Sequence, residues 1–285
     1  MGVQQAEEIV RKLWENDALA WHAQWVPVFR RFAHDLIIDI DASPGKMVLD
    51  IGTGTGVAAF EAAKRVKPDG FVFGIDRSPA MLAVGKAACK AKGIRNLRFI
   101  LMAAERLLFP NELFDAVTSN CGIPSISFRE STAEAFRVLR TGGTFAYNEW
   151  RLKDVPAHRM FSEILEKHRT KRPSRKLETQ RIALARLERF GNREMNLEAQ
   201  TQGLRMTGFR KITVKTRNYR VAMHSIEEYL NMRFRRAALR QELMELSVMR
   251  RKRMMADLRE NLKMFVRGRR FVFDWKVDFV RAKRE

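Results

Sequence analysis

The stretch VLDIGTGTG, Val48 to Gly56, places one aspartate in an apolar run and then has glycine at every second position. The run predicts a buried strand, and the glycines predict a tight turn into a helix, with a backbone that a ligand can approach closely. Val57 breaks the G-x-G-x-x-G dinucleotide fingerprint, and no Gly-Lys-Ser/Thr follows as in a phosphate loop. The turn therefore predicts a ligand-binding loop of another kind.

Strand-like and helix-like segments alternate on both sides of this loop. Strands are expected at 47–51, 71–75, 97–101, 115–119 and 144–149, and helices at 55–66, 79–92 and 130–139. This alternation predicts right-handed crossovers and a doubly wound α/β fold built on a mostly parallel sheet of seven strands. Amphipathic helices are expected over about 3–40. After Trp150, long basic helical stretches are separated by two strand-like segments that return to the sheet.

Two acids decide which ligand suits the loop. Asp50 would repel a pyrophosphate but could accept hydrogen bonds from a cationic amino-acid moiety. Asp76, at the end of the second strand in FVFGIDRS, is placed to accept both hydroxyls of a ribose. An adenosine that carries an amino acid fits both positions.

Over about Gly45 to Trp150 the chain resembles the class I S-adenosylmethionine-dependent methyltransferases, above all the ubiquinone/menaquinone methyltransferase-type subgroup. The resemblance implies S-adenosylmethionine as the cofactor, with the glycine loop along its methionine moiety. The cofactor-binding residues expected are Asp50, Gly52, Thr53, Gly54, Gly56, Asp76, Arg77, Met81, Ala103, Ala104 and Asn120. The family's adenine-reading GDAE is MAAE here, so Ala103 replaces the usual aspartate and the N–H of Ala104 would have to serve.

The segment NCGIP, Asn120 to Pro124, follows the fourth strand, where such enzymes hold the methyl acceptor. It partly resembles the Asn-Pro-Pro-aromatic motif of amine methyltransferases. By that resemblance Asn120, with a carbonyl of Cys121 or Gly122, would hold an exocyclic amine of a base, and Pro124 belongs to the same catalytic segment. Two other interpretations stay open: Asn120 caps the strand only, or Cys121 is a thiolate that attacks C6 of a pyrimidine to allow methylation at C5.

Charge is distributed unevenly along the chain. Residues 1–150 hold 18 Lys+Arg against 17 Asp+Glu, whereas 151–285 hold 36 against 16. A neutral part joined to a strongly basic part indicates a polyanionic partner, and RNA is the partner we expect. The RNA-binding residues expected are Trp21, Trp25 and Phe128, which would stack or cover the base, and the cations Arg233, Arg235, Arg236, Arg250, Arg251, Lys252 and Arg253.

The sequence thus predicts an RNA methyltransferase that acts on cytidine N4 in ribosomal RNA, similar to the archaeal-type enzymes. Alternatives are a small-molecule methyltransferase of the quinone or natural-product kind, a C5-cytosine RNA methyltransferase and a catalytically silent RNA-binding protein. The expected domains are a helical lid (1–44), a cofactor-binding core (45–150) and a basic part with the last strands (151–285). We expect a cytoplasmic monomer without a metal, because Cys/His clusters, a signal pattern and an apolar span are lacking.

Overall fold

The computed structural model describes residues 1–123, 127–151, 155–194 and 196–285. Its central sheet has the strand order β3-β2-β1-β4-β5-β8-β6. Neighbouring strands from β3 to β5 are parallel, whereas β8 is antiparallel to both β5 and β6. The strands are β1 (Met47–Ile51), β2 (Phe71–Asp76), β3 (Leu97–Leu101), β4 (Phe114–Asn120), β5 (Leu139–Trp150), β6 (Arg210–Met223), β7 (Val266–Arg267) and β8 (Arg270–Lys283).

The doubly wound α/β fold expected from the alternation of segments is confirmed, with one difference in strand count. The two-residue strand β7 pairs with the start of β8, so the sheet has eight strands in the described residues rather than seven. Chain order reverses at β1, because β2 and β3 lie on one side of it and β4 on the other. In such sheets a ligand binds at the carboxyl ends of the strands beside this switch point, which is where the loop after β1 lies.

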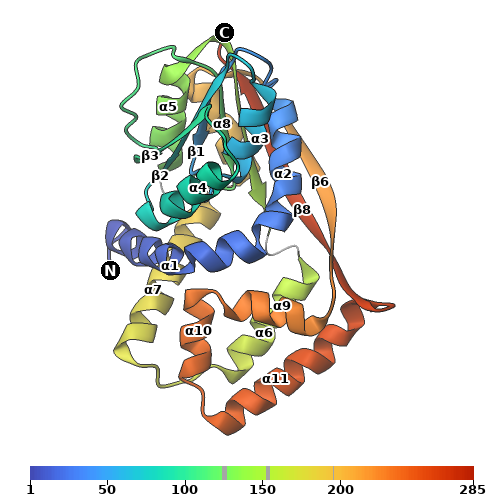
Figure 1. Cartoon of the computed structure of the whole chain (residues 1–285). Helices are drawn as coiled ribbons and strands as arrows, with labels where there is room; N and C mark the ends of the chain where they lie inside the picture. Colours follow the sequence, from blue (N-terminus) through green and yellow to red (C-terminus); the bar gives the residue numbers. More distant parts are fainter. Residues whose placement is uncertain (124–126, 152–154, 195) are drawn as a thin grey trace.

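Helices cover both faces of the sheet (Figure 1). On one face α2 (Val26–Asp39) packs on β4 and β5 with side chains such as Phe32, α3 (Val57–Arg65) packs on β1 and β4 with side chains such as Ala59, and α4 (Pro79–Ala91) covers β3. On the other face α5 (Phe128–Val138) and α8 (Leu197–Thr207) pack around Tyr147. Both faces of the parallel strands are therefore dry, as their continuous apolar sequences require.

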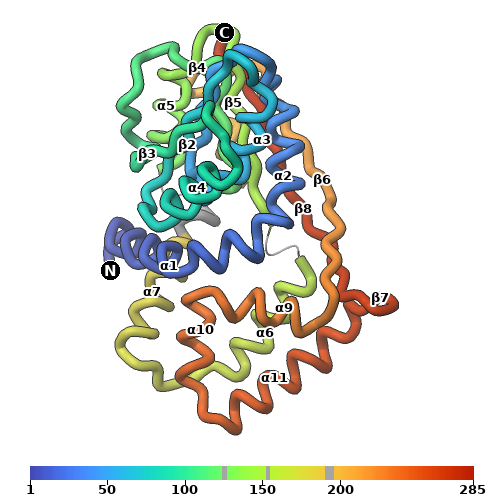
Figure 2. The backbone as a smooth tube through the Cα atoms, viewed as in Figure 1, coloured from blue at the N-terminus to red at the C-terminus, as the bar shows by residue number. Residues whose placement is uncertain are grey.

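The remaining helices form a second layer below the sheet in Figure 1. They are α6 (Pro156–His168), α7 (Arg175–Glu194), α9 (Ile226–Phe234), α10 (Ala237–Met244) and α11 (Val248–Leu262), followed by the 3₁₀ turn η3 (Lys263–Phe265). Strands β6 and β8 run from the sheet to these helices as one long pair, which Figure 2 shows as adjacent tubes ending at β7. Phe271 and Trp275 of β8 are fully buried in the core that these helices share with α2.

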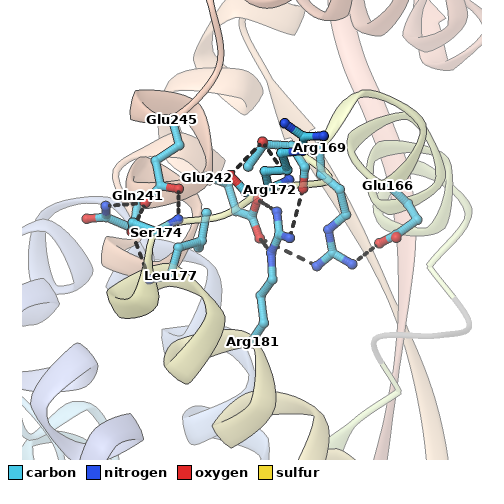
Figure 3. A network of polar contacts seen from close by, with 10 residues as sticks. Glu166, Arg169, Arg172, Ser174, Leu177, Arg181, Gln241, Glu242 and Glu245 are labelled. Carbon is cyan, nitrogen blue, oxygen red and sulfur yellow. Dashed lines mark hydrogen bonds and ion pairs between the residues drawn. The ribbon is translucent and has the colours of Figure 1, made fainter.

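A polar network joins α7 to α10 in this lower layer (Figure 3). Arg181 donates two hydrogen bonds to the buried carboxylate of Glu242, from Nε at 2.7 Å and from Nη2 at 2.6 Å. The backbone N–H of Ser174 donates to Glu245 at 2.8 Å. Paired charges of this kind fix the orientation of α7 relative to α10, because an unpaired buried carboxylate would be costly.

Helix α1 (Val3–Gln24) crosses between the sheet and the lower helices, and it contacts α4, α7 and α10. At its start, Glu7 forms an ion pair with Arg77 after β2. Further along, the buried carboxylate of Asp17 accepts hydrogen bonds from Arg236 Nε at 2.9 Å and from the N–H of Ala237 at 2.6 Å. The helix is thus attached at one end to the sheet part and at the other to α10.

Candidate active site

A cavity of about 350 Å³ lies between the carboxyl ends of β1, β2 and β4 and helix α1. One side is polar and consists of Asp50, Asp76 and the backbone of residues 52–55. The other side is apolar, and it is lined by Trp14, Trp21, Phe29, Trp150, Ile123 and Leu187. The cavity lining therefore combines a polar group of residues with a group of aromatic and aliphatic side chains.

Asp50 is fully buried at the end of β1 and only one of its two carboxylate oxygens is satisfied. Oδ2 accepts hydrogen bonds from Thr53 Oγ1 at 2.6 Å and from the N–H of Ala59 at 3.1 Å. Oδ1 has no partner among the described residues. Burial raises the pKa of Asp50 to about 7, and the nearby negative charge of Asp76 adds to the shift. An unsatisfied buried carboxylate oxygen at a cavity fits a cationic ligand group, such as the methionine ammonium of S-adenosylmethionine.

Asp76 fixes the loop and borders the cavity at the same time. Its Oδ2 accepts from the N–H of Gly54 at 2.8 Å, and its Oδ1 accepts from the N–H of Ser78 at 2.8 Å. Burial raises its pKa, while these backbone donors oppose the rise. Each carboxylate oxygen has a second lone pair, so the two oxygens can still accept the hydroxyls of a ribose.

Two loop glycines are required by close backbone packing. A Cβ on Gly52 would lie 2.3 Å from the carbonyl oxygen of Gly122, and a Cβ on Gly122 would lie 2.5 Å from that of Gly52. Gly122 brings the loop after β4 against the loop after β1, because neither backbone could approach the other past a side chain.

Arg77 lies between this first cavity and a second one of about 560 Å³, which is lined by Ala103 among others. Glu7, Arg11 and Arg77 border both cavities. Met81 lines the first cavity, whereas Ala104 is buried in the apolar core of the opposite face. The structure thus brings Arg77 and Met81 to the first cavity and Ala103 to the second, and it places the side chain of Ala104 outside both cavities.

Asn120 ends β4 at the cavity, and its orientation is set by a neighbour on β5. Its Oδ1 accepts a hydrogen bond from Asn148 Nδ2 at 2.8 Å, and Asn148 Oδ1 in turn accepts from the thiol of Cys121 at 3.1 Å. In the described part of the chain, Nδ2 of Asn120 has no partner, so this residue offers the cavity a donor. A hydrogen-bond donor suits an oxygen on the methyl acceptor better than it suits the N–H of an amine.

Cys121 borders the cavity, but its surroundings oppose the thiolate that a C5 mechanism needs. Burial raises its pKa well above the usual range, and the carboxylate of Glu149 raises it further. The residue has a left-handed φ of 55°, which serves the turn between the loops. Pro124, the last residue expected in this catalytic segment, lies outside the described residues.

Four aromatic rings form the apolar wall of the cavity. Trp14 and Trp21 meet edge to face with centroids 5.0 Å apart, and Phe29 packs edge to face on Trp150 at 4.8 Å. Of these four, only Trp21 was expected at the site. The missed signal was the helical spacing of Val10, Trp14 and Trp21, which puts them on one face of α1.

Comparison with known proteins decides the family. Residues 42–200 match the family model described as a methyltransferase domain, which is more than half of the chain. The chain belongs to the methyltransferase domain family. Its class I fold and its cofactor, S-adenosylmethionine, follow from this membership.

Quinone methyltransferases are among the curated proteins that the chain resembles, together with an arsenite methyltransferase of Halobacterium salinarum that is 33% identical over 108 residues, covering 38% of this chain and 28% of that protein. The methyltransferase is 33% identical over 145 residues to demethylmenaquinone methyltransferase of Geobacillus stearothermophilus, an alignment covering 49% of this chain and 62% of that protein. It is also 33% identical over 141 residues to the ubiquinone/menaquinone biosynthesis C-methyltransferase of Stutzerimonas stutzeri, covering 49% and 53%. The methyltransferase thus matches somewhat more than half the length of these two quinone methyltransferases.

Solved structures share the fold at lower identity. The YcgJ protein of Bacillus subtilis superposes with a TM-score of 0.55 at 20% identity, over 90% of this chain and 99% of that one. Phosphoethanolamine N-methyltransferase 2 of Haemonchus contortus, in complex with S-adenosylmethionine, gives a TM-score of 0.52 at 18% identity, over 89% and 52%.

These relatives correct the expectation of RNA methylation. The curated relatives named above are methyltransferases of quinones or of arsenite, which are small molecules, and none of the findings supports RNA as partner or ribosomal cytidine N4 as the target. The expectation was wrong because it rested on a partial resemblance of the segment NCGIP and on net charge, and charge indicates a polyanion-binding surface without saying what the active site methylates. No helix among the described residues has the length and apolar character needed to span a bilayer.

Two aromatic residues expected to contact the acceptor lie in the core of the methyltransferase instead. Trp25 is buried edge to face on Trp275 at 6.0 Å, one helical turn beyond Trp21 and turned away from the cavity lining. Phe128 is buried on the opposite face of the sheet, where it packs on Tyr147 at 5.8 Å. Both were misplaced because spacing along the chain does not reveal which face of the sheet an aromatic ring covers.

The cations expected to form one RNA-binding face divide into two groups. Arg233 lies over the ring of Phe161 at 4.6 Å, and Arg236 pairs with Asp17 and lies over Trp14 at 4.1 Å, so both have structural contacts. Among the three arginines Arg233, Arg235 and Arg236, only Arg235 is exposed. In the second cluster Arg250, Lys252 and Arg253 are exposed at the start of α11, and Arg251 is half-buried.

Proposed function

We propose that the methyltransferase transfers a methyl group from S-adenosylmethionine to a small apolar ring compound of the quinone class. The observation that carries the proposal is the division of one cavity into a side with two acids and a glycine loop and a side walled by four aromatic rings. Flat apolar acceptors are held by stacking and edge-to-face contacts with such rings. The similarity to quinone methyltransferases over about half of the chain supports the same acceptor class.

The polar side of the cavity would hold the cofactor. The free Oδ1 of Asp50 would accept from the methionine ammonium, and Asp76 would accept from the ribose hydroxyls. The glycine loop, closed against Gly122, would border the methionine chain. When bound, S-adenosylmethionine supplies an electrophilic methyl group on its sulfonium sulfur.

Asn120 is the polar residue that we assign to the acceptor. Its Oδ1 is engaged by Asn148, so its Nδ2 would donate to a ring oxygen of the acceptor. A quinol carbon next to such an oxygen is most nucleophilic when the oxygen carries negative charge. A fixed donor would stabilise the deprotonated quinol that carries this charge.

Helix α1 would act as the lid of this cavity. It supplies Trp14 and Trp21 to the acceptor side and Glu7 to the cofactor side. Helix α2 buries Phe32, Leu36 and Ile37 in the core, so of the expected lid over 1–44 we assign the covering role to α1 alone. We keep 45–150 as the cofactor-binding core and assign Leu187 of α7, within 151–285, to the acceptor wall.

Methyl transfer from radiolabelled S-adenosylmethionine tests the proposal. We expect label in a demethylated quinol with a short side chain and none in total RNA. Trp21→Leu should raise the KM for the quinol about tenfold or more, since it removes a stacking surface, and leave the Kd for the cofactor unchanged. Leu19→Ala, on the exposed side of the same helix, is the matched control and should change neither constant.

A second variant tests the role of Asn120. Asn120→Leu should lower kcat about 10²-fold while the Kd for the cofactor stays within about twofold, because the acceptor oxygen loses the donor that favours its deprotonated, reactive form and the cofactor side is unchanged. Label found in RNA rather than in the quinol would overturn the acceptor class. Equal kcat values for Asn120→Leu and the unmodified protein would overturn the role of the amide.

A further inference from the structure

An exposed surface at the end of the lower helices is unlike the rest of the molecule. Met244 ends α10, and Val248 and Met249 begin α11, so three apolar side chains lie within six residues of each other. Their exposed fractions are 70%, 71% and 62%. Apolar side chains so exposed gain nothing from the fold of this chain, and clusters of them mark contact surfaces.

Cations flank these apolar side chains. Arg250, Lys252 and Arg253 are exposed in the first turns of α11, and none of the three forms an ion pair with another described residue. Nearby acids are already engaged, because Glu242 binds Arg181 and Glu245 binds Ser174. The inner side of α11 is buried through Met254, Leu258 and Leu262. The outer side of this turn therefore presents unneutralised positive charge.

Folding adds a second basic segment to the same surface. The loop before α7 touches the end of α10 through Ser174 and Glu245, as Figure 3 shows. This loop carries the exposed cations Lys171 and Arg172, and α7 begins with the exposed Arg175 and Lys176; the side chains of these four form no ion pair within the described ranges. Residues about 75 positions apart in the sequence thus form one surface, which we name the basic tip and define by these seven cations with Met244, Val248 and Met249.

We propose that the basic tip binds the surface of an anionic phospholipid bilayer. Cations beside protruding apolar side chains match both layers of a membrane interface, where phosphates lie next to acyl chains. A nucleic acid would use the cations but has no comparable apolar layer to receive the methionines. Membrane binding by the basic tip follows from the exposure and charge of its residues, whichever compound accepts the methyl group.

Sedimentation with vesicles tests the proposal with the full chain. We expect the protein to bind vesicles of equal amounts of phosphatidylglycerol and phosphatidylcholine and to stay in solution with phosphatidylcholine alone. Reversing Arg250, Lys252 and Arg253 to Glu should lower the partition coefficient more than about 100-fold, since each cation near an anionic surface contributes about fivefold and the three new carboxylates are repelled in addition. Lys90→Glu, Lys92→Glu and Arg95→Glu together change the net charge equally on the α/β part and should lower it far less.

An uncharged variant separates a bilayer from other polyanions. Val248→Ser with Met249→Ser keeps every cation and should still lower the partition coefficient about tenfold, because the inserted apolar surface is lost. Circular dichroism and Tm check that each variant folds. The proposal is overturned if the unmodified protein ignores anionic vesicles, if both charge-reversal variants lose binding equally, or if the tip binds duplex RNA with no effect of the serine variant.

Discussion

Replacement of Asp50 by Asn should weaken cofactor binding and remove its dependence on pH. The carboxylate has one satisfied oxygen, bonded to Thr53 and Ala59, and one free oxygen at the cavity. Asparagine keeps the shape of the group and an acceptor oxygen for the internal bonds. It loses the charge that would bind an ammonium, and a charge-assisted hydrogen bond contributes about 1.5–3 kcal/mol. The Kd for S-adenosylmethionine should therefore rise about 10- to 150-fold at pH 7.5.

The pH dependence follows from the raised pKa. Because burial raises the pKa of Asp50 to about 7 in the free protein, acid protonates the carboxyl before the cofactor binds. Binding of an ammonium requires the charged form, so the complex holds fewer protons than the free protein and affinity falls as pH falls below 7. The Kd should rise about tenfold at pH 6 and about 100-fold at pH 5, while the amino group of the ligand stays protonated below about pH 7.7.

Isothermal titration calorimetry between pH 5 and 7.5 measures both effects. The Kd of the unmodified protein should rise steeply as the pH falls below 7, whereas the Kd of Asp50→Asn should hardly change with pH. Asp115→Asn is the matched control, because Asp115 accepts a hydrogen bond from the N–H of Met47 outside the cavity. Its Kd should rise at acid pH as in the unmodified protein. An equal rise of the Kd at acid pH in Asp50→Asn would refute the reasoning, since another group would then have to be titrating.

Two further substitutions test the surroundings of the cavity. Cys121→Ser should keep kcat within about threefold, because burial disfavours the thiolate and serine can still donate to Asn148; a loss of a hundredfold or more would restore a nucleophilic role. Glu242→Gln should lower the free energy of unfolding by about 2–4 kcal/mol, measured by urea denaturation, since Arg181 loses its charged partner. Glu166→Gln at the exposed partner of Arg169 should change it by less than about 1 kcal/mol, and an equal loss in both would contradict this ranking.

The cofactor side of the site could be predicted from the sequence because it is built from local features. Strand β1, the glycine loop and helix α3 follow one another within twenty residues. The roles of the glycines and of Asp50 are set by this short-range backbone geometry. Asp76 follows at the end of the next parallel strand, where the register of β1 and β2 places it beside the loop. The alternation of segments then required a doubly wound sheet.

The acceptor side was decided by tertiary structure alone. Trp14, Phe29 and Trp150 come from α1, α2 and β5, and only the path of α1 across the sheet edge brings their rings to one wall. The same packing buries Phe128 behind the sheet and pairs Arg236 with Asp17, 219 positions earlier, although both side chains look available in the sequence. Composition revealed an excess of positive charge. Which of these charges remain exposed depends on contacts between distant segments, because a cation buried beside a carboxylate and a cation in water have the same letter in the sequence.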